Sequence, residues 1–289
     1  MFKVKLARHI GFCAGVRRAI GIVEKTLQDS RAAVYSLGSV IHNPQEVNRL
    51  TQLGLRVVHS VDSVPDNAIL ILPTHGTPKR ILERALHKRL KLIDVMCPYV
   101  ASVHAICKKL FEEGLTVVII GDRDHPEIKA LKDRAPGARI ISEESEIRSQ
   151  AFAGKKIGII SQTTQSKDKF FKMVETILAR NPDLSQVHMF NTICLDTANR
   201  QKEVKQLAET VDAVLVIGAR SSANTKRLVH CGRKSNAKTY LVESPSSCPH
   251  AFVKGCGSVG VISGASAPDW LVKDIVMQLR REHKKIHHR

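Results

Sequence analysis

The feature that most constrains the fold of this chain is a repeated pattern of short apolar runs. Six such runs each end in small polar, Gly or His residues, and they lie at 33–44, 68–78, 116–127, 156–166, 213–224 and 258–269. Most continue into residues with helical spacing, most clearly over 80–90, 167–180 and 269–285. Apolar strand, polar turn and helix in repetition are typical of parallel sheets covered by helices. The pattern predicts an α/β fold with mostly parallel sheets.

The length and the cysteine content limit the organisation further. A chain of 289 residues favours two or three packed subdomains, and 43% hydrophobic residues suffice for a real core. The apolar runs fall far short of the ~20 residues that a membrane span needs. The start, MFKVKLARHIG, resembles a strand rather than a secretion signal. Seven cysteines, an odd number, do not suggest a disulfide framework, so we expect a reducing cytoplasm.

The formal net charge of +18 admits several partners. A solvated basic surface is the simplest interpretation, and phosphorylated substrates or an acidic partner protein also suit it. Nucleic acid is disfavoured, because aromatic residues make up only 4% of the chain and none stands in a basic-aromatic series that could stack on bases. The densest basic cluster is the tail over 280–289.

Polar side chains gather where the predicted strands end. In parallel sheets, ligands bind beyond the carboxyl ends of the strands. One polar strand end is ordinary turn chemistry, but six with hydroxyl, amide and imidazole groups favour a shared site. The residues concerned are His42, Asn43, Thr74, His75, His125, Glu127, Thr163, Ser222, Asn224 and Ser266. Three other carboxylates, Glu24, Glu46 and Glu83, fall on predicted helical surfaces and receive no role.

Three cysteines share one local context. Cys13, Cys97 and Cys194 each stand just before a stretch with helical spacing, and Pro98 follows the second of them. Unpaired N–H groups and the helix dipole favour a thiolate at a helix entrance, and the thiolate is the form that ligates iron or zinc. If each subdomain supplied one thiolate, the three would meet at a common centre. Ligands this far apart in sequence do not by themselves distinguish a metal site from three reduced cysteines.

The other four cysteines lack this context. Cys107 lies within a helical stretch, where a small apolar core role is expected. Cys231, Cys248 and Cys256 are irregularly spaced and lack the paired C-x2-C knuckles of a zinc module.

The assembled motifs resemble the 4-hydroxy-3-methylbut-2-enyl diphosphate reductase (LytB/IspH) family. They occur in the family's order and cover nearly the whole chain. The matching segments are GFCAGVRRAI, VIHNP, THG, DVMCP, HPE, SQTTQS, TIC with TANRQ, SSANTKRL and SGASAPDWLV. Several are weak alone, but nine in register are very specific.

The resemblance implies three pseudo-equivalent α/β lobes around a central iron–sulfur site. We expect the lobes at 14–96, 97–193 and 194–289, the third together with an N-terminal strand at 1–13. By resemblance, Cys13, Cys97 and Cys194 hold a [4Fe–4S] cluster with one open iron site. The substrate's diphosphate is bound by His42, His75, His125, Ser222, Asn224 and Ser266. Glu127 delivers protons, with His125 beside it and Thr163 near the hydroxyl end of the substrate.

The implied reaction is reductive dehydroxylation to isopentenyl and dimethylallyl diphosphate in non-mevalonate isoprenoid biosynthesis. An iron with an open position acts as a Lewis acid toward the allylic hydroxyl and feeds electrons to the same carbon framework. Loss of that hydroxyl as water requires a proton. The basic surface then suits an acidic electron donor such as a ferredoxin or flavodoxin, because complementary charge speeds encounter.

The chain departs from the family pattern at a few positions. Pro73-Thr74 precedes the His-Gly step in place of the common serine-alanine pair, Met96 replaces a threonine, and Ala223 replaces a polar residue. Asp122 and Asp124 would repel a diphosphate if they faced inward. These departures motivate one alternative function, a non-catalytic paralogue that binds an iron–sulfur cluster or a phosphorylated ligand.

Overall fold

The computed structural model describes residues 2–248 and 255–287. The last two residues of the basic tail therefore lie outside the described residues. By contacts the chain divides into two compact units. Unit 1 comprises residues 1–18, 41–52 and 195–289, and unit 2 comprises residues 19–40 and 53–194. The lobe boundaries given above stay a prediction.

The described residues form three sheets of four parallel strands each, which confirms the predicted fold class. The sheet of unit 1 has the order β1 (Lys3–Leu6), β12 (Ser258–Ser263), β10 (Ala213–Ile217), β11 (Thr239–Val242). The first sheet of unit 2 has the order β3 (Leu55–Val58), β2 (Val34–Leu37), β4 (Ile69–Leu72), β5 (Lys91–Asp94). The second has the order β7 (Arg139–Ile141), β6 (Thr116–Ile120), β8 (Lys156–Ser161), β9 (Gln186–Met189).

The six apolar runs of the sequence form the two central strands of each sheet. Central strands are almost entirely buried, as in β10, whose five residues are all buried. Edge strands are more exposed, as in β1, where no residue is buried. A central strand of a covered parallel sheet is buried on both faces and therefore needs a continuous apolar run, whereas an edge strand does not.

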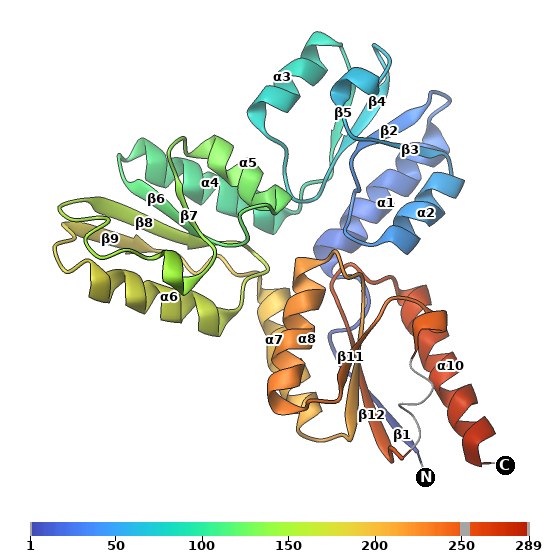
Figure 1. Cartoon of the computed structure of the whole chain (residues 1–289). Helices are drawn as coiled ribbons and strands as arrows, with labels where there is room; N and C mark the ends of the chain where they lie inside the picture. The colour runs from blue at the N-terminus through green and yellow to red at the C-terminus, as the bar shows by residue number, and fades with distance from the viewer. Residues whose placement is uncertain (1, 249–254, 288–289) are drawn as a thin grey trace. The chain divides into compact units, whose positions relative to one another are not determined.

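In the sheet of unit 1, helices pack on both faces (Figure 1). Because strand residues alternate between faces, Leu215 of β10 packs with Leu271 and Ile275 of α10 (Asp269–His287). Val216 points the other way, into a cluster with helices α7 (Leu195–Ala208) and α8 (Ala223–Ser235). The carboxyl ends of β10 and β12 lead into the loops with Ser222, Asn224 and Ser266.

The two sheets of unit 2 are covered in the same manner. On β6, Val117 and Ile119 pack with α4 (Pro98–Glu112) and α5 (Pro126–Arg134), and α6 (Lys167–Arg180) lies on the opposite face (Figure 1). On the other sheet, Leu70 and Leu72 of β4 pack with Ala85 of α3 (Lys79–His87).

In the part of the chain that the structure describes, the remaining elements are two helices and three short 3-10 turns. Helix α1 (Ala14–Asp29) follows Cys13, and α2 (Pro44–Gln52) follows Asn43. The 3-10 turns are η1 (Val61–Ser63), η2 (Glu144–Glu146) and η3 (Pro245–Ser247). Among the described residues, no helix combines the length and the apolar character that crossing a membrane requires.

Candidate active site

Every central strand is followed by residues that the sequence singled out. In unit 1, β10 leads to Ser222 and Asn224 and β12 leads to Ser266. In unit 2, β4 leads to His75, β6 leads to His125 and Glu127, and β8 leads to Thr163. The sixth central strand, β2, is followed by His42, which belongs to unit 1.

The three candidate cysteines occupy equivalent positions in the three sheets. Each cysteine follows one edge strand of its sheet: Cys13 follows β1, which pairs with β12; Cys97 follows β5, which pairs with β4; and Cys194 follows β9, which pairs with β8. Each backbone N–H donates to a carbonyl in the loop after that central strand. The N···O distances are 3.1 Å from Cys13 to Ala265, 3.1 Å from Cys97 to Thr74 and 2.9 Å from Cys194 to Thr163. The same turn thus holds each cysteine at the start of a helix.

Exposure separates these cysteines from the other four. Cys13, Cys97 and Cys194 are partly exposed, whereas Cys107, Cys231, Cys248 and Cys256 are buried. Burial raises the pKa of the Cys107 thiol to about 12, although Arg134 opposes the shift. The pKa values of Cys248 and Cys256 are also raised, mainly by burial. Among the seven, the three predicted ligands are therefore the accessible thiols.

In unit 2, the Glu127 carboxylate is tied to Thr163 through both oxygens. The Thr163 backbone N–H donates to Oε1 and its hydroxyl donates to Oε2, each at 2.7 Å. Both residues are almost fully buried, with exposed fractions of 2% and 5%. Because the carbonyl of Thr163 also accepts from the Cys194 N–H, the acid and one candidate ligand share one backbone segment.

His125 begins α5 as its N-cap. Its Nδ1 accepts from the backbone N–H of Glu127 at 3.2 Å. In the neutral imidazole the proton then resides on Nε2, which makes that atom a hydrogen-bond donor. The ring of His75 lies at 6.5 Å from that of His125, centroid to centroid, so two imidazoles predicted to bind diphosphate are near neighbours.

A tyrosine that the sequence analysis did not single out connects the two cysteine turns of unit 2. Tyr99, two residues after Cys97, donates its hydroxyl to the carbonyl of Ile193 at 2.9 Å. The hydroxyl has a raised pKa, first because of burial and second because of Cys194 nearby. Unit 2 therefore brings Cys97, Cys194, Glu127 and their partners together.

In unit 1, the amide of Asn224 is buried without a partner. Its exposed fraction is 4%, and neither Nδ2 nor Oδ1 has a hydrogen bond among the described residues. Ser222 caps the same helix, α8, because its side chain accepts from the Thr225 N–H at 3.3 Å. Leaving a buried amide unpaired costs ~1–3 kcal/mol, so this position points to a ligand with hydrogen-bonding oxygens.

Ser266, Asn43 and His42 form a second group in unit 1. The Asn43 amide donates to the Ser266 carbonyl at 2.9 Å, and the Ser266 hydroxyl donates to the His42 carbonyl at 3.3 Å. The pKa of His42 is lowered, mainly by burial and further by Lys226. A His42 ring that stays neutral offers one N–H donor at neutral pH.

Arg200 is a structural residue of this region that the sequence analysis did not assign. It is 1% exposed and pairs with Asp196 at 2.7 Å. Its guanidinium donates to the carbonyls of His9, Gly11 and Ser263 at 2.9–3.0 Å. Arg200 thereby joins the segment before Cys13 to the end of β12 and to α7. Only its place in the TANRQ motif could have drawn attention to it.

One carboxylate was placed wrongly. Glu46 was expected on a helical surface, but its exposed fraction is 0%. It accepts from Trp270 Nε1 at 3.1 Å and pairs with Arg49 at 2.5 Å. A tryptophan distant in sequence covers it, which the spacing within α2 could not reveal.

The two carboxylates of the GDRDHPE stretch differ in exposure. Asp124 is 98% exposed along its side chain and lies 3.9 Å from Lys129 Nζ. Asp122 is partly exposed, and its backbone N–H donates to the Gln162 side chain at 2.9 Å. The carboxylate of Asp124 therefore points to solvent.

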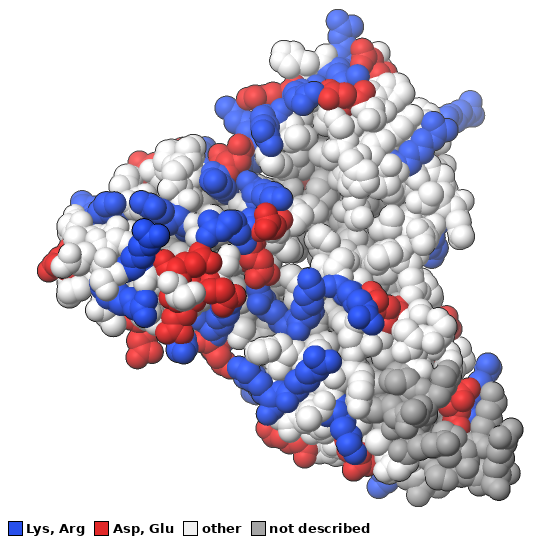
Figure 2. All heavy atoms as spheres, viewed as in Figure 1, with Lys and Arg blue, Asp and Glu red and all other residues white. Residues whose placement is uncertain are grey.

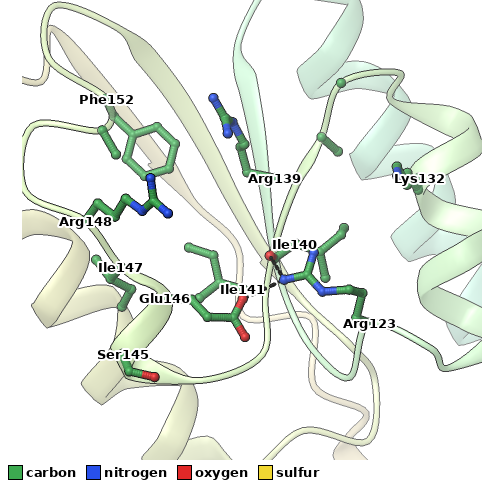
Figure 3. Close-up of a pocket in the computed structure, with 13 residues that line it drawn as sticks. Arg123, Lys132, Arg139, Ile140, Ile141, Ser145, Glu146, Ile147, Arg148 and Phe152 are labelled. Carbon is green, nitrogen blue, oxygen red and sulfur yellow. Dashed lines mark hydrogen bonds and ion pairs between the residues drawn. The ribbon is translucent and has the colours of Figure 1, made fainter.

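A pocket of about 720 Å³ lies elsewhere on unit 2, along β7 (Figure 3). Arg123 spans its floor, donating to the Ile140 carbonyl at 3.1 Å and pairing with Glu146 at 2.6 Å. Arg139 and Arg148 lie around the same space, and neither forms an ion pair with a described residue (Figure 3). None of the predicted site residues lines this pocket.

The face shown in Figure 2 carries basic side chains widely, with acidic ones among them. The basic groups do not merge into one continuous patch on this face.

The predicted site residues divide between the units. Cys13, His42, Ser222, Asn224 and Ser266 belong to unit 1, and the remaining ones belong to unit 2. Within either unit, the described His, Cys, Asp and Glu side chains form no group of three that could hold a metal ion. Each unit by itself thus carries part of the predicted constellation.

Comparisons with known proteins place the chain in a family. A protein-family model described as "LytB protein" matches residues 4–280 of this chain. The chain is 36% identical to the 4-hydroxy-3-methylbut-2-enyl diphosphate reductase of Aquifex aeolicus over 283 residues, covering 97% of this chain and 96% of the relative. The corresponding reductase of Geobacter metallireducens is 36% identical over 278 residues, covering 96% and 97%. The chain belongs to the LytB family.

Solved structures agree with this placement. The E-1-hydroxy-2-methyl-but-2-enyl-4-diphosphate reductase of Plasmodium falciparum matches with a TM-score of 0.91 at 28% identity, over 96% of this chain and 87% of that one. A structure described as (E)-4-hydroxy-3-methyl-but-2-enyl diphosphate reductase, the terminal enzyme of the non-mevalonate pathway, matches with a TM-score of 0.68 at 34% identity. That match covers 97% of this chain and all of that one. Fold and sequence therefore point to the same class of reductase.

Proposed function

We propose that this protein reduces 4-hydroxy-3-methylbut-2-enyl diphosphate to isopentenyl and dimethylallyl diphosphate, the terminal step of the non-mevalonate pathway. The reaction consumes two electrons and two protons and releases the allylic hydroxyl as water. Relatives that carry the name of this reductase and match this chain over nearly their full length support the proposal. The observation that carries it is the trio of equivalent turns that each present one accessible cysteine at a helix start.

The proposed cofactor is a [4Fe–4S] cluster held by Cys13, Cys97 and Cys194. The donor set suits it, because thiolates are the ligands of such clusters and these three thiols are the accessible ones. Each cysteine precedes a helix, whose dipole favours the thiolate. When bound, a cluster with three protein ligands supplies electrons and one iron that is open to an oxygen of the substrate.

The proposed diphosphate ligands are His42, His75, His125, Ser222, Asn224 and Ser266. The unpartnered Asn224 amide supports this role, because phosphate oxygens would accept from its Nδ2. His125 offers an Nε2 donor, because its Nδ1 accepts from Glu127. Uncharged donors of this kind bind a diphosphate by hydrogen bonds, and the departure at Ala223 leaves both Ser222 and Asn224 in place.

Glu127 is the proposed proton donor. The hydroxyl leaves as water only if its oxygen receives a proton, and a buried carboxylic acid can supply one. Thr163 holds both carboxylate oxygens at 2.7 Å, so it fixes the orientation of the acid. When Glu127 is protonated, we expect it to donate to the Thr163 hydroxyl, which then donates its own hydrogen to the oxygen at the hydroxyl end of the substrate.

The non-catalytic alternative gains no support. The relatives reported above carry the names of reductases, and the proposed acid and all three cysteines are present. Of the departures, Met96 donates its backbone N–H to the Asp94 side chain at 2.8 Å, and the Thr74 hydroxyl donates to the Val40 carbonyl at 3.0 Å. Neither contact removes a predicted ligand.

The proposed electron donor is an acidic protein such as a ferredoxin or flavodoxin, and the proposed location is the cytoplasm. A net charge of +18 favours encounter with an acidic surface. None of the seven cysteines forms a disulfide within the described part of the chain, which suits a reducing compartment. Turnover driven by such a donor should fall as salt rises, whereas turnover driven by dithionite should change little. Equal salt dependence in both assays would contradict an electrostatic encounter.

Iron analysis of cysteine variants tests the cofactor. Anaerobically purified protein should be brown, with broad absorption near ~400 nm. Cys13→Ser, Cys97→Ser and Cys194→Ser should each lose iron, and Cys107→Ser, a buried cysteine in α4, is the matched control. Full iron retention in all three single variants would overturn the ligand assignment. Anaerobic turnover of the hydroxylated diphosphate with dithionite tests the activity itself.

A further inference from the structure

His104 is a buried polar residue to which the proposed mechanism gives no role. It lies in α4, seven residues after Cys97, and its exposed fraction is 5%. Neither ring nitrogen has a hydrogen-bond partner among the described residues. Burial lowers the pKa of His104 to about 4, with a smaller effect from Arg134, so the ring is neutral at physiological pH.

The ring of His104 fills the space above Gly76. A Cβ added at Gly76 would lie 2.9 Å from both Cε1 and Nε2 of His104 and 3.5 Å from the Cβ of Ala130 in α5. Gly76 also has a φ of +91°, which favours glycine. The segment thus passes between α4 and α5 with the backbone of Gly76 against the imidazole edge.

This segment carries His75, one of the proposed diphosphate ligands. It is a tight turn, because the Gly76 N–H donates to the Pro73 carbonyl at 3.3 Å. The Cys97 N–H donates to the carbonyl of Thr74 within the same turn. Helix α4 therefore holds the turn at two points, through Cys97 at its start and through the His104 ring further along.

The neutral imidazole costs stability at this position. Two buried nitrogens without hydrogen bonds forfeit ~1–3 kcal/mol each. At the equivalent position, seven residues after the other two candidate cysteines, the chain has Ile20 and Gln201, also buried. An apolar side chain therefore fits one equivalent position, and packing alone does not require a histidine.

We propose that His104 is a positioning residue that sets the height of the His75 turn above α4 and so places the His75 ring for the substrate's diphosphate. The inference rests on the proposed function. The inference gives a role to His104, which is not one of the proposed ligands, and His104 acts through its contact with Gly76.

The test measures binding of inorganic pyrophosphate to anaerobically purified holoenzyme by calorimetry, together with KM and kcat. His104→Ala should weaken pyrophosphate binding and raise KM on the order of tenfold, as expected for a ligand side chain displaced by a fraction of an ångström. The ~400 nm absorption should be unchanged. His104→Gln keeps a planar group of similar reach and should restore most of the affinity. Val103→Ala, on the same helix but in the core, is the control that lowers stability without changing affinity.

A double-mutant cycle with Gly76→Ala tests the route. Both arms share the backbone strain of an alanine at φ +91°, so the strain cancels. If His104 acts through Gly76, the loss of affinity caused by Gly76→Ala is smaller in the His104→Ala background than in the wild type. Additive effects, or wild-type affinity in His104→Ala, overturn the proposal. A wild-type holoenzyme that does not bind pyrophosphate overturns the proposed diphosphate site, and the positioning role falls with it.

Discussion

Replacing Glu127 by glutamine separates the chemical role of this residue from its structural one. The carboxylate accepts two hydrogen bonds from Thr163, both at 2.7 Å, and is 2% exposed. Glutamine keeps one acceptor oxygen, and the Thr163 hydroxyl can turn to accept from the new NH2 group. Both charge-assisted bonds thus become neutral ones while neither partner is left unpaired, so the free energy of unfolding should fall by only ~1–2 kcal/mol. The variant should fold and keep its ~400 nm absorption.

Turnover should respond far more strongly than stability. Glutamine cannot deliver the proton that the leaving hydroxyl needs, and a positioned general acid contributes ~10²–10⁴-fold to rate. Anaerobic turnover with dithionite measures kcat, and thermal unfolding of the same preparation measures stability. Thr163→Val is the companion variant, because it removes the hydroxyl donor and leaves the backbone donor to Oε1 in place. A Glu127→Gln protein with kcat within threefold of the wild type would refute the assignment of the acid.

Three further changes have outcomes that the structure predicts. Asn224→Ala removes an unpartnered buried amide, so stability should not fall, whereas KM should rise ~10–100-fold because a hydrogen bond to a charged ligand is lost. Arg200→Met leaves Asp196 without its partner and three carbonyls without a donor, and chemical denaturation should show a loss of ~3–5 kcal/mol. Because the pKa of His104 is about 4 in the folded state, against the ordinary 6.5, the unfolded chain binds more protons between these values. Its contribution to stability is complete above pH ~6.5 and is lost as pH falls toward 4, by ~3 kcal/mol. Thermal unfolding of the wild type and of a His104→Gln variant across this range should show a smaller loss in the variant, and equal losses would contradict the assignment.

The sequence predicts the central strands of the fold and the N-terminal edge strand β1, but not the other edge strands. All six apolar runs are strands, and they pair two by two at the centre of the three sheets. Strands such as β3 and β9 were not predicted, because an edge strand is only partly covered and therefore needs no continuous apolar run in the sequence. Helix α6 begins and ends where the spacing predicts, at Lys167 and Arg180.

For the candidate site, the sequence identified side chains but not what holds them. Strand ends and helix entrances are local signals, and they single out His75, Glu127 and Cys97 without any tertiary knowledge. Arg200 and His104 lie inside helices, and their significance arises from contacts with segments far away in the chain. Glu46 was misplaced for the same reason, since Trp270 covers it. Whether the three sulfurs bind one cluster stays a prediction, which the iron analysis tests.

Some of the positive charge of the chain lies on the edge strands of the three sheets, where it affects how two sheet edges can approach each other. An uncovered strand edge offers unpaired N–H and C=O groups to any other strand, and a flat apolar edge is a seed for aggregation. All six edge strands are three to four residues long, and four of them carry cationic side chains, namely Lys3 and Lys5 in β1, Arg56 in β3, Lys91 in β5 and Arg139 in β7. The other two, β9 and β11, have no lysine or arginine. Two copies that approached along any of these four cationic strands would bring like charges together, so we expect these lysines and arginines to disfavour edge-to-edge association there.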